Sequence, residues 1–289
     1  MDFLLEALTN WLKEMLVGGI MGNLSGMFDS VNQQVGDISV QVGQTPQGWN
    51  GGIFSMIQNL SNSIMVPIAG VILAIVMTLE LIQMITDKNN LHDVDTWMIF
   101  KWVFKSATAI LLVTNTWNIV MGVFDMAQSV VAQASGIISS DTAIDISSIL
   151  TDMEPRLMEM DLGPLFGLWF QSMFIGVTMW ALYICIFIVI YGRMIEIYLV
   201  TSVAPIPIAA MMGKEWGGMG QNYLRSLLAL GFQAFLIMVC VAIYAVLVQD
   251  IATEEDVIMA IWSCVGYTVL LCFTLFKTGS LAKSVFQAH

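Results

Sequence analysis

Residues 63–86 read SIMVPIAGVILAIVMTLELIQMIT, a run in which Glu80 is the only charged residue. About twenty apolar residues in a helix cross the hydrocarbon core of a bilayer, which is roughly 30 Å thick. Similar runs recur along a chain that is 57% hydrophobic and only 11% charged, less than half of the charged fraction of a typical soluble domain. The sequence therefore predicts an all-α polytopic membrane protein, in which residues 62–289 form a bundle of five spans. The predicted spans are 63–86, 102–128, 165–191, 224–249 and 257–276.

Residues 1–61 are expected to form an external region with one helix and one loop. Apolar side chains recur at three- and four-residue spacing over residues 2–16, and the charged ones fall on the other side. This spacing predicts an amphipathic helix on a membrane surface or against a neighbouring protein. A polar, Gly- and Gln-rich loop is expected over residues 29–52. Between them, three glycines at every fourth position favour either close approach of a second helix or a flexible exit: Gly18, Gly22 and Gly26.

Charge predicts the orientation, because lysine and arginine favour the cytoplasmic side. With five spans, one side of the membrane holds eight of the ten lysines and arginines, in residues 87–105, 193–225 and 277–289. The segments on the opposite side are strongly acidic: 1–61, 136–164 and 250–256. We therefore expect the N-terminus outside, an external acidic loop over 136–164, and the C-terminus in the cytoplasm.

The apolar pattern breaks over residues 203–226, which read VAPIPIAAMMGKEWGGMGQNYLRS. Pro205 and Pro207 each remove a backbone donor and oppose a continuous helix. An unpaired carbonyl in hydrocarbon costs several kcal/mol. We therefore expect a broken or re-entrant segment on the cytoplasmic side, over residues 193–223. The alternative is a kinked sixth span over residues 194–212, which would place more lysine and arginine outside.

Glycines in this segment are expected to supply the turn after the prolines. Four of them lie close together, and Gly217 and Gly218 are the candidate structural positions among them. Arg225 is expected to anchor the next span at the inner surface.

Charged residues inside or beside the spans are the candidate functional positions. A carboxylate within a span is costly and faces a bundle interior or water, so Glu80 is expected to pair with Lys101 or Lys105. The alternatives are a proton site and a hydrated residue near the interface. The two lysines lie at the predicted inner mouth of the second span, where they either meet DNA phosphates or follow from topology alone. Topology is the favoured interpretation.

Two further groups of polar residues lie within predicted spans. Asn115 and Asn118 either face a hydrated lumen or bond between helices, which is the more frequent use of such residues. Arg193 and Glu196 are three residues apart on a predicted helix and are expected to pair with each other.

Several classes of chemistry lack their usual motifs. The sequence has two histidines, no GxxxxGK[ST] motif and no CxxC spacing. These features argue against a histidine metal site and a P-loop nucleotide site. We expect no catalytic, cofactor or metal residues, and we expect any energy to come from another protein or from a gradient.

The run TSVAPIPIAAMMGKEWGGMGQNYLRSLLALGFQAF, residues 201–235, resembles the signature region of TrbL-type polytopic inner-membrane subunits of conjugative type IV secretion systems. In that family an APIP-like turn, a short glycine-bearing stretch and a GFQ helix follow the central spans. The resemblance in layout extends over most of the chain. Some members carry long soluble C-terminal extensions, which are not expected here because the sequence ends soon after Thr278.

This resemblance implies a non-enzymatic channel or platform subunit in the bacterial cytoplasmic membrane. Such a subunit assists the transfer of single-stranded DNA with bound relaxase. It implies a homo-oligomeric ring among membrane lipids, with other secretion subunits and ATPases as partners. DNA contact follows from the resemblance alone, because the acidic external segments oppose phosphate binding. The alternative is a secondary transporter that uses Glu80 and the broken segment 203–220, although no second interrupted half is evident.

Overall fold

The computed structural model describes residues 2–86, 96–141, 146–251 and 257–288. These residues form helices and connecting turns, with no strand among them, which confirms the predicted all-α class. Within the described residues, five helices are long and apolar enough to cross a membrane, as predicted. They are Gly51–Thr86, Thr96–Thr114, Leu162–Ser202, Gly217–Ile251 and Ile258–Val285.

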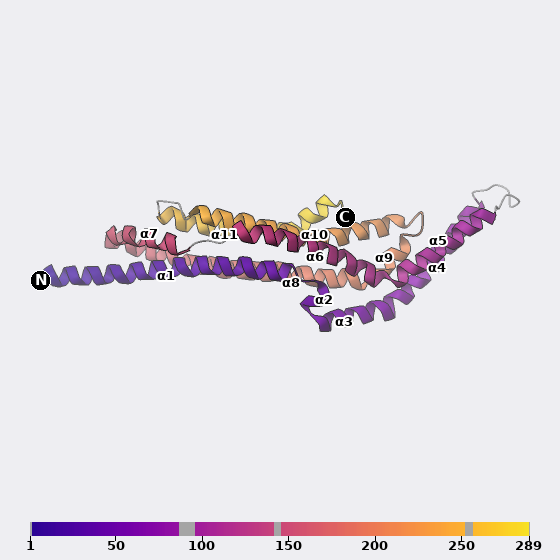
Figure 1. Ribbon diagram of the computed structural model, residues 1–289, viewed down its shortest axis with the longest axis horizontal. Coiled ribbons are helices and arrows are strands. Elements are labelled where there is room, and N and C mark those ends of the chain that lie inside the picture. The colour runs from indigo at the N-terminus through magenta and orange to yellow at the C-terminus, as the bar shows by residue number, and fades with distance from the viewer. Residues whose placement is uncertain (1, 87–95, 142–145, 252–256, 289) are drawn as a thin grey trace. The chain divides into compact units, whose positions relative to one another are not determined.

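The helices follow one another along the chain in the order shown in Figure 1. They are α1 (Asp2–Val42), α2 (Pro46–Trp49), α3 (Gly51–Leu60), the π-helical turn η1 (Ser61–Met65), α4 (Val66–Thr86), α5 (Thr96–Thr114), α6 (Thr116–Asp141), α7 (Ile146–Glu159), α8 (Leu162–Ser202), α9 (Pro205–Ala210), α10 (Gly217–Ile251) and α11 (Val257–Val285).

The chain divides into two compact units, and each combines segments that are far apart in the sequence. Unit 1 comprises Met1–Val42, Val131–Ile190 and Leu236–Thr278. Unit 2 comprises Gly43–Val130, Tyr191–Phe235 and Gly279–His289.

In unit 1, α1 extends well beyond the predicted amphipathic segment. The polar run that was expected to form a loop from residue 29 continues the helix as far as Val42. The reason is visible in the packing: Leu24, Ile38 and Val42 lie on one helical face and are buried. The expected loop is therefore limited to the residues after α1. The predicted apolar face of residues 2–16 is mostly exposed, because Leu4, Leu8 and Trp11 are each more than half exposed.

Gly18, Gly22 and Gly26 form neither the flexible exit nor the close helix contact that the sequence suggests. The helix continues through them, so the flexible exit is wrong. Open space surrounds the position of a Cβ at Gly18, Gly22 and Gly26, whereas a Cβ at Gly19 would lie 2.6 Å from the indole Nε1 of Trp169. The close approach within unit 1 therefore occurs at Gly19, where α1 meets α8.

A hydrogen bond between side chains also links α1 to α8 in unit 1. Asn23 donates from Nδ2 to the hydroxyl of Ser172 over 2.8 Å. The Ser172 side chain is fully buried, so this bond satisfies a polar group away from water.

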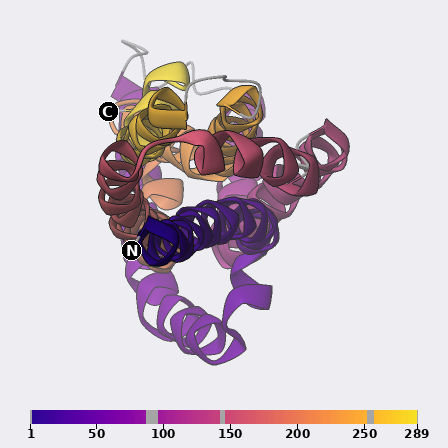
Figure 2. The same cartoon turned by 90° about the vertical axis from the view of Figure 1, so that its left-hand side faces the viewer.

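Unit 2 begins with the short helices α2 and α3, drawn in purple in the lower part of Figure 2. Asn50 lies between them in the sequence. The side chain of Asn50 caps α3 by accepting from the backbone N–H of Ile53 over 3.0 Å. The hydroxyl of Tyr198 in α8 donates to the carbonyl of Pro46 over 2.6 Å. The Tyr198 ring packs with Phe54 and Trp117 in a small aromatic cluster.

A π-helical turn connects α3 to α4. The Val66 N–H donates to the carbonyl of Ser61, one residue further back than in an α-helix. Pro67 follows immediately, and its ring lacks an N–H and clashes with the carbonyl four residues earlier. The wider turn therefore carries the helix past the proline without ending it.

The second predicted span is not one helix in the structure. α5 ends at Thr114 and α6 begins at Thr116, with Asn115 between them. The side chains of Thr114 and Asn115 both turn back and donate to carbonyls of the preceding turn, including that of Leu111 over 3.2 and 2.9 Å. The backbone ladder nevertheless continues past the break, because the N–H of Asn115 donates to the carbonyl of Leu111 and the N–H of Ile119 donates to the carbonyl of Asn115, each over 3.1 Å.

The predicted interruption after the third span is present but shorter than expected. α8 continues to Ser202 and α10 already begins at Gly217, so only residues 203–216 depart from long helices. Within them, α9 is a six-residue helix that starts at Pro205. Because Pro205 occupies the first position of α9, its missing N–H is not needed there. A sixth long span over residues 194–212 is absent from this described segment.

Candidate functional site

The central feature of unit 2 is an ion pair between two of its helices. Glu80 lies on α4 and is 6% exposed, and its Oε1 pairs with the ammonium of Lys105 on α5. The Lys105 side chain is 39% exposed. Of the two lysines that the sequence offers as partners, the structure brings Lys105 to Glu80. The second carboxylate oxygen, Oε2, is buried and has no hydrogen-bond partner among the described residues.

Two neighbouring contacts hold α5 against α4 beside this pair. The indole Nε1 of Trp102 donates to the carbonyl of Met77 over 2.9 Å. The hydroxyl of Ser106 lies 3.2 Å from the Met77 sulfur. Residues 102, 105 and 106 are three or four positions apart or adjacent in sequence, so they lie on the same side of α5. This turn of α5 therefore positions the Lys105 ammonium.

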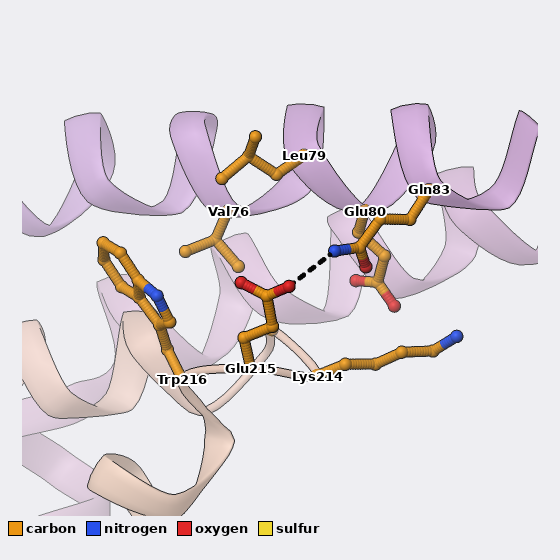
Figure 3. A pocket seen from close by; sticks show the side chains of 8 residues that line it. Val76, Leu79, Glu80, Gln83, Lys214, Glu215 and Trp216 are labelled. Carbon is orange, nitrogen blue, oxygen red and sulfur yellow. Dashed lines mark hydrogen bonds between the residues drawn. The ribbon is translucent and has the colours of Figure 1, made fainter. Parts of the chain in front are cut away.

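The turn after α9 covers the Glu80 side of α4 (Figure 3). Gln83 donates from Nε2 to Oε1 of Glu215 over 3.0 Å. A Cβ at Gly213 would lie 2.7 Å from the Val76 side chain, so the turn comes very close to α4 at this glycine.

A small pocket lies between α4 and this turn. Its lining includes Glu80, Gln83, Glu215 and Trp216, and its cavity volume is about 20 Å³. A buried water needs roughly 10–15 Å³ of such space. The pocket can therefore hold about one water molecule beside the Glu80 carboxylate, and it is too small for an organic substrate.

The described residues contain no group of three or more His, Cys, Asp or Glu side chains that could hold a metal ion. The interactions of the Glu80 region that the structure shows are electrostatic. They consist of a paired carboxylate and ammonium and an amide-to-carboxylate bond, and there is room for a water.

Arg193 and Glu196 do not pair with each other, which corrects the prediction. Glu196 Oε1 accepts from the Lys283 ammonium of α11 over 2.9 Å. Arg193 is 6% exposed and donates from Nε to the carbonyl of Leu230 in α10 over 3.2 Å. Its Nη1 has no acceptor among the described residues. The two side chains leave α8 in different directions because α10 and α11 offer closer acceptors and donors than the neighbouring turn does.

Asn115 and Asn118 form no interhelical hydrogen bond with another described residue. Asn115 is exposed and donates to Leu111 within its own helix, and Asn118 is exposed. Lys101 is also exposed, and its ammonium lies 5.6 Å from the ring centre of Trp97. None of these three side chains pairs with Glu80, whose cation is Lys105.

Some of the candidate positions that the sequence suggests in and beside the interrupted segment are buried, and others are exposed. Pro205 and Pro207 are buried in α9, and Gly217 is buried at the start of α10. Gly218 and Arg225 are exposed.

Gly220 is the most crowded glycine of the interruption. A Cβ there would lie 2.3 Å from Cβ of Met211 and 2.5 Å from the carbonyl oxygen of Pro207. Open space surrounds the same position at Gly218. The sequence alone does not show which of Gly218 and Gly220 is crowded, because the crowding depends on residues 207–211 packing against α10.

The family described as TrbL/VirB6 plasmid conjugal transfer like protein matches residues 31–205, which is more than half of the chain. The chain belongs to the TrbL/VirB6 plasmid conjugal transfer-like family. No curated protein and no solved structure matches it. The TrbL-type resemblance is confirmed, although the run 201–235 that carries it overlaps the matched residues only at 201–205.

Membership in the TrbL/VirB6 family identifies the chain as a component of a conjugal transfer, or type IV secretion, apparatus. Together with the five helices that can cross a membrane, it identifies a multi-pass protein of the bacterial inner membrane. The matched residues include α2 to α8 and therefore contain both members of the Glu80–Lys105 pair.

Proposed function

We propose that this TrbL/VirB6-family chain is a channel or platform subunit that helps single-stranded DNA, with bound relaxase, to cross the cytoplasmic membrane. The observation that carries this proposal is the family match over residues 31–205. The chain works as a homo-oligomeric ring beside other secretion subunits and dedicated ATPases. The missing P-loop motif supports dependence on such ATPases.

The Glu80–Lys105 pair has a structural role in this proposal. It fixes α5 against α4 and thereby orders one wall of the subunit. A carboxylate and an ammonium that neutralise each other are far less costly in a membrane than either charge alone. Lys101, Arg225 and Asn118 are among the exposed polar side chains that a hydrated path or a neighbouring subunit can contact.

The first test is an in-frame deletion of the gene in a donor strain, with complementation by the intact gene. We expect transfer frequency to fall below detection while growth stays normal, and complementation to restore transfer. Unchanged transfer in the deletion strain would overturn the proposal.

Crosslinking then tests DNA contact in the complemented strain. A photoreactive residue at Asn118 is expected to crosslink to transferring DNA, and one at Ile195, an exposed apolar position of α8, serves as the control. Equal crosslinking at both positions, or none at Asn118, would contradict DNA passage along this side of the chain.

The secondary-transporter alternative requires a substrate site at Glu80. The pocket there has room for about one water molecule, which supports the structural role. If the deletion strain transfers normally but loses uptake of a solute, and a Glu80→Gln variant loses it too, the transporter interpretation replaces the channel.

A further inference from the structure

An apolar groove runs between α4 and α5 within unit 2, next to the Glu80–Lys105 pair. Its volume is about 390 Å³. Small side chains line it on α4, at Gly70, Ala74 and Thr78, and Ser106, Ile110 and Val113 line it on α5. A Cβ at Gly70 would meet nothing within 4 Å. The groove is therefore real open space along two helices that can cross the membrane.

The length of the groove matches one leaflet of a bilayer. Its lining extends from Val66 to Thr78 on α4 and from Trp102 to Thr114 on α5. Twelve residues of helix rise about 18 Å, and one leaflet contributes about half of the roughly 30 Å hydrocarbon core. The groove thus has the length of a single acyl chain that lies parallel to the helices.

The volume of the groove also favours an acyl chain over a helix. A helix with its side chains is about 10 Å wide, so 18 Å of it occupies on the order of 1,400 Å³. That exceeds even the whole empty volume of the groove, which is about 820 Å³ with its open side included. Within hydrocarbon, an open apolar groove that a helix does not fill is filled by lipid tails.

Two residues near one end of the groove are of types that are common at the level of lipid headgroups, and one of them, Lys101, lies beside the groove without lining it. Trp102 lines this end, and Lys101 lies one residue earlier with its ammonium over the ring of Trp97. Tryptophan and lysine are typical of the level of the headgroups. Lys105 is neutralised by Glu80, whereas Lys101 forms no ion pair among the described residues. An anionic headgroup complements this lysine.

We propose that the α4–α5 groove binds one phospholipid, with one acyl chain between the helices and an anionic headgroup at Lys101. The inference rests on the membrane location of the chain and not on the proposed role in DNA transfer. The expected orientation places this end in the cytoplasmic leaflet, whose anionic lipids would supply the headgroup.

The test is the amount of phospholipid that stays with the protein after purification in mild detergent, measured by native mass spectrometry. Wild-type protein is expected to retain about one phospholipid per chain, enriched in anionic species. Gly70→Leu fills the groove and is expected to reduce retention about tenfold, which corresponds to the loss of about two buried methylenes. Val71→Phe, at an exposed position of α4 that does not line the groove, is expected to match wild type.

Lys101→Gln is expected to keep the lipid but lose the enrichment in anionic species. Ala74→Phe fills the groove at another position and provides a second test should Gly70→Leu fail to fold. Equal lipid retention by both filling variants and wild type would overturn the proposal. If these variants keep the lipid but convert oligomers to monomers, the groove receives a second copy of the chain and the lipid proposal is wrong.

Discussion

A single carboxylate, Glu80, shows what hydropathy alone can predict about a charged residue in a span. Its position near one end of an apolar run indicates that a cation must lie close. Lys101 and Lys105 lie at the end of the next predicted span on the same side, and Lys105 is the partner in the structure. The same reasoning fails for Arg193, because its acceptor belongs to α10, which is 37 residues away in the sequence.

Removing one member of the Glu80–Lys105 pair is expected to destabilise the protein. In Lys105→Gln the buried Glu80 carboxylate loses its cation, and we expect a loss of about 1–3 kcal/mol of unfolding free energy. This is less than for a fully buried pair, because the lysine is partly exposed. Glu80→Gln, Lys105→Gln and the double variant form a double-mutant cycle, measured by denaturant titration in mixed micelles.

The exposed pair of Glu196 with Lys283 is the matched control for this cycle. Both of its side chains are more than 40% exposed, so its coupling energy is expected to stay below about 1 kcal/mol. A Glu80–Lys105 coupling no larger than that of the control would contradict a structural role for the pair.

At the scale of single helices, the sequence predicts where apolar runs lie better than where helices end. The third, fourth and fifth spans are recovered as α8, α10 and α11, although each helix is longer than predicted. Hydropathy does not locate the helix ends, because polar residues there can form the same backbone hydrogen bonds as apolar residues. The polar stretch that ends α1 is helical because its buried face packs within unit 1.

The first turn of α10 gives a prediction from two nearby glycines, Gly218 and Gly220. Gly220→Ala places a methyl group against backbone atoms of residues 207–211 that cannot move independently. We expect it to lower the unfolding free energy by about 1–3 kcal/mol, the usual cost of overpacking. Gly218→Ala meets open space and should be neutral or slightly stabilising. The thermal midpoints of both variants in detergent test this difference, and equal midpoints would contradict the packing of α9 against α10.

For the whole molecule, composition and charge predict a polytopic membrane protein with five spans, and the structure confirms this number among the described residues. The division into two units could not be predicted, because each unit combines three segments that are separated along the chain. Within the candidate site, the pairing of Glu80 was predictable. The Gln83–Glu215 bond and the crowding at Gly213 were not, because they depend on the return of a distant turn onto α4. The crowding at Gly220 was not predictable either, because it depends on the packing of residues 207–211 against α10.

The orientation in the membrane remains a prediction of the distribution of charge. A green fluorescent protein fused to the C-terminus is expected to fluoresce, because that protein folds in the cytoplasm. Alkaline phosphatase fused after Gly136 is expected to be active, because that position is expected to lie outside. Activity of the phosphatase at the C-terminus instead would reverse the orientation.

The neutrality of the Glu80–Lys105 pair has a consequence for the electrical behaviour of the membrane. A single charge that crosses the full membrane potential exchanges about 2.3 kcal/mol with it for every 100 mV. A carboxylate and an ammonium that move together carry no net charge, so the potential does no net work on them. The pair can therefore stay in place, or shift with its two helices, through the voltage changes of an energised cell.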